Sequence, residues 1–276
     1  MAQKQKNWNL LKMLSNFNSE NFAVEYLKKH NLLGLLKSIE KKSITNEDVE
    51  KGLLLKPDYC DLARLHWLAT QRRAINILEL GGGFSSLIFA DALQKNLNSL
   101  EIELQSVSRA SKPFVLFSVD ESEACVKHTR ALIPENIREH SNISSSKVLV
   151  KEHLGRICTV YEKLPNMLPD LIYIDGPSQF ACDGNIRGVT FTLPERMPLS
   201  GDIFLIEYLL EPGCLIVCDG RTNNYQFLKK FLSRNWVGKR DFKADIGLLE
   251  LQEEPLGNLN ANKLNYSLPN GLWLES

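Results

Sequence analysis

The sequence predicts an α/β protein built on a mostly parallel sheet of seven strands. From residue 74 onwards, short apolar segments alternate with helical patterns, which is typical of a parallel sheet covered by helices on both faces. Two further predicted strands near the C-terminus are joined by a short charged loop and predict an antiparallel hairpin at one sheet edge. Residues 8–73 show only helical periodicity. We therefore expect a helical N-terminal extension over 1–73 (a cap, lid or dimer element), an α/β domain over 74–252 and a loosely ordered tail over 253–276.

The individual elements follow from two periodicities. Predicted strands are short and continuously apolar or alternating, and predicted helices repeat apolar residues at three- and four-residue spacing. In the N-terminal part, Thr45 or Asn46 is expected to cap a helix. Two polar segments, 96–113 and 179–199, are expected to be inserted loops, the first as a loop or hairpin. Strands are predicted at 75–80, 114–119, 147–150, 171–174, 214–218, 236–242 and 246–252, and helices at 85–97, 121–133, 200–211 and 223–234.

Composition argues against several classes of protein. Lys plus Arg and Asp plus Glu are equal at 33 each, so no global field attracts nucleic acid or an anionic membrane. The longest apolar runs, such as 203–206 and 214–218, are too short to span a bilayer, and the first residues do not resemble a secretory signal. The six cysteines form no CxxC pair, which gives no zinc-type spacing and favours a reduced, cytoplasmic protein.

The strongest functional signal is the segment 75–90. An apolar strand ends in three consecutive glycines, and a serine then follows to cap a helix. This arrangement lets a ligand lie against bare backbone at a helix N-terminus, so it predicts a nucleotide-type ligand. An ordinary tight turn is the alternative. The residues concerned are Gly81, Gly82, Gly83, Ser85 and Ser86.

Polar residues follow the other predicted strands. Asp120, Asp175 and Asp219 each lie at the end of a predicted strand. In an open parallel sheet, ligands bind outside the carboxyl ends of the strands. Converging carboxylates repel one another, and such clusters bind cations, hydroxyls or amines. For Asp120 a helix cap is the alternative interpretation.

Together these features resemble the class I S-adenosylmethionine-dependent methyltransferases, over residues 74–252. The segment Glu79-Leu-Gly-Gly-Gly-Phe-Ser is similar to that family's first motif, acid-x-Gly-x-Gly-x, whose loop contacts the methionine part of the cofactor. Asp120 looks like the acid that holds the ribose hydroxyls, and Asp175 falls where the fourth motif borders the transferred methyl group. The resemblance implies a Rossmann-like fold with its antiparallel edge hairpin. It implies the cofactor-binding residues Glu79, Gly81, Gly82, Gly83, Ser85 and Asp120, with Tyr161 stacking on adenine or simply packing in the core.

The sequence departs from expected patterns at two places. Gly83 and Asp120 are 37 positions apart, whereas about 20 are expected in a dinucleotide fold, so Glu101 and Glu103 are alternatives for the ribose acid. Ser86 stands in place of the third glycine of the dinucleotide fingerprint, which disfavours a dehydrogenase.

A magnesium site and a general base are further expectations. Asp175 and Asp219, with Asn224 or its neighbour Asn223, resemble the ligands of magnesium-dependent O-methyltransferases, although the family's usual Asp-Asn pair is Asp219-Gly220 here. Such a metal would lower the pKa of an acceptor hydroxyl. His153, after the predicted third strand, is a candidate catalytic base alongside Asp175 and Asp219. A clamp for phosphate or carboxylate, or simple pinning of a loop, is expected of Arg187, Arg196 and Arg221.

The resemblance implies S-adenosylmethionine-dependent methylation, with the oxygen of a small or sugar-like hydroxyl acceptor as the expected target. The segment Asp175-Gly-Pro-Ser-Gln-Phe is only distantly similar to the Asp-Pro-Pro-aromatic motif of amino-methyltransferases, and no basic stripe favours nucleic acid. Four alternatives stay open: a non-catalytic Rossmann-like binding subunit, a nucleotide-sugar or NAD enzyme, an amino-methyltransferase, and an aminopropyltransferase, to which the triple glycine is also similar. A homodimer through the N-terminal helices is a further expectation.

Overall fold

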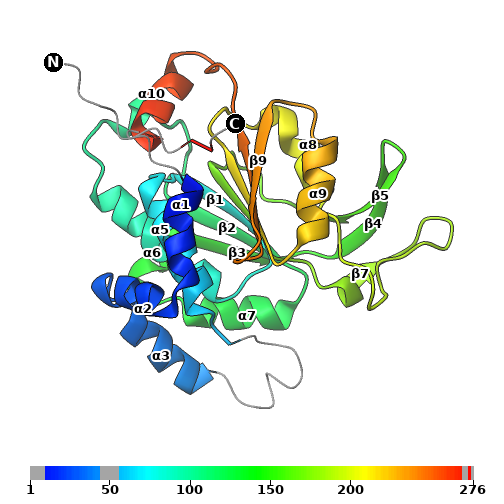
Figure 1. Ribbon diagram of the computed structural model, residues 1–276, viewed down its shortest axis with the longest axis horizontal. Helices are drawn as coiled ribbons and strands as arrows, with labels where there is room; N and C mark the ends of the chain where they lie inside the picture. The colour runs from blue at the N-terminus through cyan, green and yellow to red at the C-terminus, as the bar shows by residue number, and fades with distance from the viewer. Residues whose placement is uncertain (1–9, 44–55, 269–272, 275–276) are drawn as a thin grey trace.

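The computed structural model describes residues 10–43, 56–268 and 273–274 (Figure 1). Thr45 and Asn46, the expected helix caps, lie outside these residues. The main sheet has seven strands in the order β3-β2-β1-β6-β8-β10-β9, and β10 is antiparallel to both of its neighbours while the other pairs are parallel. The Rossmann-like fold with an antiparallel edge hairpin is therefore confirmed. The strands are β1 (Asn76–Leu80), β2 (Val115–Asp120), β3 (Ser141–Ser145), β6 (Leu171–Ile174), β8 (Leu215–Asp219), β9 (Trp236–Asp241) and β10 (Ile246–Leu251).

Successive strand residues face two separate hydrophobic cores. In β1, Ile77 belongs to the first core and Leu78 to the second, as the alternation of a pleated strand requires. The first core is covered by α5 (Tyr59–Gln71), α6 (Phe84–Asn98) and α7 (Glu123–Leu132). The second is covered by α8 (Asp202–Ile206), α9 (Thr222–Phe231) and a small second sheet. In Figure 1, α5 and α6 lie to the left of the main sheet and α8 and α9 to its right.

The expected helical extension is present in the described part of the N-terminal region. Its buried residues, such as Leu14 and Phe17, belong to the first core together with residues of the main sheet. Asp58 caps α5 by accepting hydrogen bonds from the backbone N–H groups of Cys60 and Asp61 at 2.8 and 3.2 Å. The preceding elements are α1 (Leu10–Ser15), the 3₁₀ helix η1 (Asn16–Asn18), α2 (Glu20–Lys29) and α3 (Leu32–Ser43).

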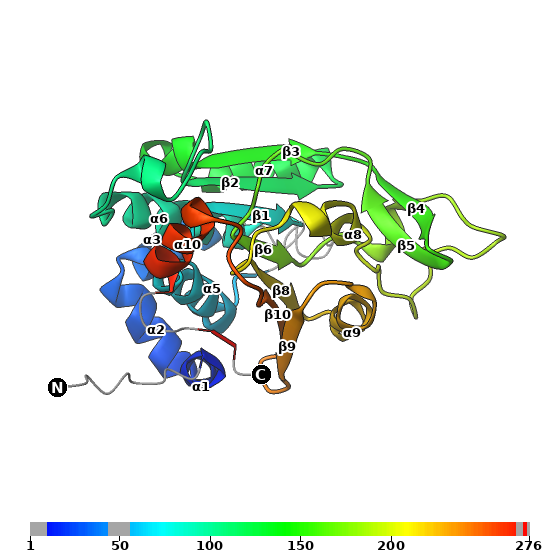
Figure 2. The ribbon, with the colours of Figure 1, turned by 90° about the horizontal axis from the view of Figure 1, so that it is seen from above.

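The third strand of the main sheet is not the predicted one. Residues 148–150 of the predicted segment do lie in a strand, β4 (Val148–His153), but it pairs with β5 (Arg156–Tyr161) and β7 (Cys182–Asp183) in the second sheet. Figures 1 and 2 show β4 and β5 projecting away from the N-terminal helices. The edge strand β3 is Ser-Asn-Ile-Ser-Ser and buries only Ile143. Because it has a single neighbour and little burial, it lacks the apolar run by which buried strands are recognised.

The C-terminal segment is more ordered than the expected loose tail. It contains the helix α10 (Asn258–Ser267), and Tyr266 and Leu268 are buried against the first core. The segment 99–114 is a loop around the short η2 (Leu104–Ser106), and the segment 176–199 is largely irregular, as predicted. In the ranges that the structure describes, no helix is long and apolar enough to cross a membrane. The remaining short helices are η3 (Glu135–His140), η4 (Gln179–Ala181) and η5 (Glu207–Leu209).

Candidate functional site

A cavity of about 350 Å³ lies at the carboxyl ends of β1, β2, β6 and β8, with the start of α5 on one side. The three-glycine loop lines it, as does the turn after β6. Its lining is strongly acidic. The carboxylates are Asp58, Asp61, Asp120, Glu121, Asp175 and Asp219, and the cationic side chains among the lining residues are Lys56 and Arg221.

The backbone N–H groups of the glycine loop are all engaged within the protein. Gly81 N donates to the carbonyl oxygen of Val119 at 2.8 Å, and Gly82 N donates to Oδ2 of Asp120 at 3.0 Å. Gly83 N donates to Oγ of Ser86 at 3.3 Å. A phosphate cradle needs free N–H groups that point at the ligand. This loop therefore presents bare backbone, without the free donors that a pyrophosphate requires.

Two glycines bring the loops after β1 and β6 into backbone contact. Gly81 has φ +95°, and a Cβ there would lie 2.5 Å from the nitrogen of Gly176. A Cβ on Gly176 would in turn lie 2.7 Å from Cα of Gly81. Gly176 N donates to the carbonyl oxygen of Leu80 at 2.6 Å, which ties the two loops together. Both positions consequently require glycine.

Glu79 does not line the cavity, although we expected it to contact the cofactor. Its carboxylate is fully buried behind the loop, where it accepts hydrogen bonds from Oγ of Ser85 at 2.6 Å and from Oγ of Ser86. Burial raises the pKa of Glu79 to about 7, and the serine hydroxyls oppose that shift. Glu79 thus fixes the loop against the first turn of α6, and Ser85, which does line the cavity, is one of the residues it holds.

Asp120 lies at the cavity, and its alternatives do not. Besides Gly82 N, it accepts a hydrogen bond at 2.8 Å from the backbone N–H of Ser122. Glu101 and Glu103 are exposed on the loop that leads into the opposite, amino end of β2. The long spacing from the glycine loop is therefore an extended α6–β2 connection, after which Asp120 ends β2 next to β1.

The two other predicted aspartates also meet here. Asp219 Oδ2 accepts a hydrogen bond from the hydroxyl of Tyr173 at 2.7 Å. Burial raises the pKa of Asp219 to about 7, and the nearby Asp61 carboxylate adds to this rise. Asp175 borders the cavity with a side chain that is 53% exposed, yet burial among its neighbours raises its pKa to about 6. Its carboxylate oxygen lies 3.8 Å from Nε of Arg221.

The expected magnesium site is not supported by the arrangement. Asn224 is fully buried away from the cavity, where its Oδ1 accepts a hydrogen bond from the backbone N–H of Ser200 at 3.1 Å and its Nδ2 donates to the hydroxyl of that residue. An amide oxygen so engaged does not face the two aspartates. Among the residues described, no group of three or more His, Cys, Asp or Glu side chains could hold a metal ion.

Neither His153 nor Tyr161 lines the cavity. His153 lies at the end of β4 beside the hairpin turn, where its ring stacks on Phe204 with centroids 5.1 Å apart. It does not line the cavity, because the strand we expected to lead there belongs to the second sheet. Tyr161 is buried behind Gly176, where a Cβ on that glycine would lie 2.8 Å from the tyrosine oxygen, so it packs in the core without lining the cavity.

Of the three predicted arginines, only Arg221 lines this cavity. It donates to the carbonyl oxygen of Pro177 at 2.9 Å and to that of Asp175, and so holds the turn after β6. Arg187 is exposed on the inserted segment, and Arg196 donates to the carbonyl oxygen of Thr190 at 2.7 Å.

Sequence reasoning missed the contribution of α5 and of β6. Asp58 and Asp61 lie at the start of α5, and only tertiary packing places that helix beside the carboxyl ends of the strands. Tyr173 is a single hydroxyl in an otherwise apolar strand, which was a detectable signal. Glu121 follows Asp120 directly and accepts a hydrogen bond from Ser178 N at 2.9 Å.

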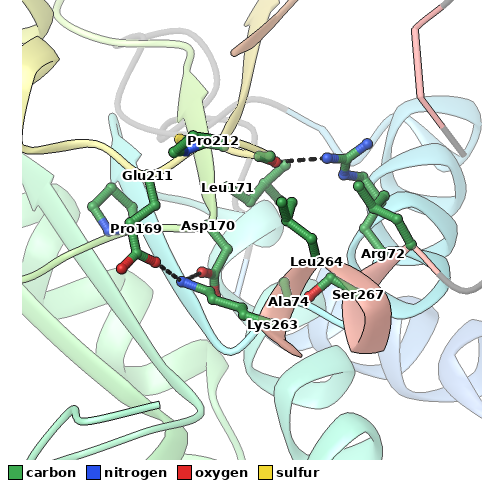
Figure 3. Close-up of a pocket in the computed structure, with 13 residues that line it drawn as sticks. Arg72, Ala74, Pro169, Asp170, Leu171, Glu211, Pro212, Lys263, Leu264 and Ser267 are labelled. Atoms are coloured by element: carbon green, nitrogen blue, oxygen red, sulfur yellow. Dashed lines mark hydrogen bonds and ion pairs between the residues drawn. The ribbon is translucent and has the colours of Figure 1, made fainter. Parts of the chain in front are cut away.

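A second, much smaller hollow of about 20 Å³ lies at the amino ends of the strands. Figure 3 shows Lys263 of α10 between Asp170 and Glu211 there, with an Nζ–Oε2 distance of 3.0 Å to the latter. Asp170 also accepts hydrogen bonds from the backbone N–H groups of Ile75 and Asn76 at 2.7 and 2.8 Å. The volume suits a single water at most, so this cluster anchors α10 to the sheet.

No family model matches the sequence, and no curated protein matches it. Similar solved structures include the O-methyltransferase TomG from Streptomyces achromogenes, in complex with SAM, at 14% identity over 91% of this chain and 100% of that chain, with a TM-score of 0.43. Another is an O-methyltransferase from Bacillus cereus with SAH, at 14% identity over 80% and 91%, with a TM-score of 0.44. The SAH-bound methyltransferase PaMTH1 of Podospora anserina gives 13% identity over 79% and 93%, with a TM-score of 0.42. The likeness concerns the arrangement of elements and carries no conclusion about ligand or acceptor.

Proposed function

We propose that this protein is an S-adenosylmethionine-dependent methyltransferase that methylates a hydroxyl group of a small or sugar-like acceptor. The observation that carries the proposal is the cavity beside the glycine loop, with its six carboxylates and two cationic side chains. S-adenosylmethionine has a sulfonium and an ammonium group against one carboxylate, so an acidic cavity suits it. A pyrophosphate would meet repulsion from these carboxylates and would find the glycine N–H groups already engaged.

The residues at the carboxyl ends of β1 and β2 suit the two ends of this cofactor. Gly81, Gly82 and Gly83 border the cavity without side chains, which leaves room for the methionine part. Asp120 accepts one backbone hydrogen bond on each carboxylate oxygen. Each oxygen retains a further lone pair, so the carboxylate can also accept hydrogen bonds from a ribose diol.

The residues at the ends of β6 and β8 suit the acceptor. The cofactor supplies the methyl group, and the protein has to remove the proton of the acceptor hydroxyl. Asp219 faces the cavity and is held by the hydroxyl of Tyr173. Since burial raises its pKa to about 7, its carboxylate can accept that proton near neutral pH. Arg221 fixes the turn that carries Asp175 beside it.

Isothermal titration calorimetry of the purified chain with S-adenosylhomocysteine tests the cofactor assignment. We expect micromolar binding that is the same with and without Mg²⁺, and no binding of NAD. Asp120→Ala should abolish the binding, whereas Glu101→Gln, the matched change at the alternative acid, should leave it intact. Gly81→Arg should also abolish it. Absence of binding with and without Mg²⁺ would refute the proposal.

A further inference from the structure

A groove of about 680 Å³ lies between α9 and the segment 189–199 of the inserted loop. It shares no lining residue with the cofactor cavity. The two sites are nevertheless adjacent along the chain, because Arg221 lines the cavity and Asn223 lines the groove. The irregular segment 176–199 likewise lines the cavity with Gly176 and Ser178 and the groove with its later part. The groove therefore begins two residues from Arg221, which lines the cavity where acceptor chemistry is proposed.

One stripe of α9 forms an aromatic wall of the groove. Phe227 is only 8% exposed and packs edge-to-face on Phe231, with ring centroids 5.4 Å apart. The guanidinium of Arg156 lies 3.9 Å above the ring of Phe231. These contacts hold the rings in place, so the wall is pre-formed for an apolar or aromatic ligand. The stripe follows helical spacing and consists of Asn223, Gln226, Phe227, Lys230 and Phe231.

Polar groups without partners lie next to this wall. Asn223, Gln226 and Lys230 are exposed, and none of their side chains makes a hydrogen bond or ion pair among the residues that the structure describes. On the opposite side the groove has Arg196 and Glu195. Its charged lining is therefore two cations and one carboxylate, the reverse of the acidic cofactor cavity. This charge favours an anionic ligand group beside the aromatic wall.

We propose that this groove binds the non-reacting part of the acceptor, an apolar or aromatic body that carries an anionic group. The identification of the ligand as the methyl acceptor rests on the proposed function. Binding by the groove does not, because it can be tested without turnover. Lys230 faces the anionic group, the two phenylalanines contact the apolar body, and the amides of Asn223 and Gln226 bind polar atoms between them. The reacting hydroxyl then extends past Arg221 into the acidic cavity.

The test uses two fluorescent probes that share an apolar body and differ in charge. 8-Anilinonaphthalene-1-sulfonate is anionic, and N-phenyl-1-naphthylamine lacks the sulfonate. Lys230→Glu is compared with Lys229→Glu, a matched charge reversal at an exposed neighbour that does not line the groove. We expect Lys230→Glu to weaken binding of the sulfonate about fivefold or more, while Lys229→Glu has little effect. Binding of the uncharged probe should be the same in both variants.

Each outcome decides the groove separately from the cofactor. Equal affinity of the two variants for the sulfonate would overturn the proposal, as would an absence of sulfonate binding to the unaltered chain. Equal losses of both probes in Lys230→Glu would also count against it, because the charge would then not be recognised. Titration of the same variants with S-adenosylhomocysteine should show unchanged affinity. If neither the unaltered chain nor either variant binds S-adenosylhomocysteine, the methyltransferase proposal is refuted, but the probe result on the groove still stands.

Discussion

Replacing Gly81 by alanine should separate the two loops that form the cavity at the carboxyl ends of the strands. At this position φ is +95°, which L-residues with a Cβ rarely adopt. The new Cβ would lie 2.5 Å from the nitrogen of Gly176 and 2.8 Å from its Cα. These are backbone atoms, so no side-chain rotation relieves the overlap. The loop has to move, and the hydrogen bond from Gly176 to the carbonyl oxygen of Leu80 is then strained or lost.

Two costs set the expected loss in the free energy of unfolding for Gly81→Ala. The left-handed backbone costs a β-carbon about 1–2 kcal/mol. Overpacking against the neighbouring backbone adds about 1–3 kcal/mol. The free energy of unfolding should fall by about 3 kcal/mol, which corresponds to a loss of about 6–12 °C in Tm for a chain of this size. Affinity for S-adenosylhomocysteine should fall too, because the displaced loop borders the cavity.

Gly83→Ala is the matched control for this substitution. Gly83 lies in the same loop, its φ of 164° is extended backbone, and a Cβ there would meet no atom within 4 Å. Its stability should therefore stay within about 0.5 kcal/mol of the unaltered chain. Urea unfolding followed by circular dichroism and thermal melting measure both variants. Equal stability of the Gly81 and Gly83 variants would refute the reasoning, since the predicted difference comes entirely from backbone geometry.

Three further predictions concern groups outside the glycine loop. Burial raises the pKa of Asp202 from 3.8 to about 7, so the folded state holds its proton more tightly than the unfolded state. The free energy of unfolding should therefore fall by on the order of 4 kcal/mol as the pH rises from about 4 to 7, and then level off. Asp202→Asn retains an acceptor for Tyr161 N and should remove that part of the decline in urea titrations at successive pH values; an unchanged slope would contradict this. Lys263→Ala leaves two carboxylates without their cation and should lower the free energy of unfolding by on the order of 3 kcal/mol. Its affinity for S-adenosylhomocysteine should not change, because the cluster lies at the opposite end of the sheet; loss of affinity without loss of stability would be inconsistent with an anchoring role. His153→Ala should bind S-adenosylhomocysteine as well as the unaltered chain in calorimetry, and a large loss would show that the hairpin reaches the site.

Local sequence patterns were sufficient to predict the segments that are buried on both faces or that turn through glycine. Strands β1 and β6 are continuously buried, and the apolar runs at 75–80 and 171–174 predicted them closely. The edge hairpin β9–β10 was also predicted, because a short charged loop joins its two strands, although no residue of β9 is fully buried. The polar edge strand β3 buries only Ile143, so the more apolar β4 was assigned to its place. That error misplaced His153.

The predicted site residues also fall into two groups, those that reach the cavity and those that point elsewhere. Asp120, Asp175 and Asp219 reached the cavity because parallel strands bring their carboxyl ends to one edge, whatever the intervening loops do. Glu79 and Asn224 were assigned from their positions in motifs that resemble the family's, but the direction of their side chains depends on packing. Glu79 is buried behind the loop, and Asn224 bonds to Ser200. Residue type alone carries no information about such orientation.

Sequence patterns alone were enough to predict six of the seven strands of the main sheet, the glycine turn and the aspartates at the strand ends. These features depend on periodicity and on backbone freedom within a few residues. Tertiary packing settles three features that no such pattern shows: Gly81 meets Gly176, α5 adds Asp58 and Asp61 to the cavity, and Gly82 N already donates to Asp120. Each of these contacts joins segments that are distant in the chain. Their geometry arises only when the sheet and both cores have packed, which no local pattern encodes.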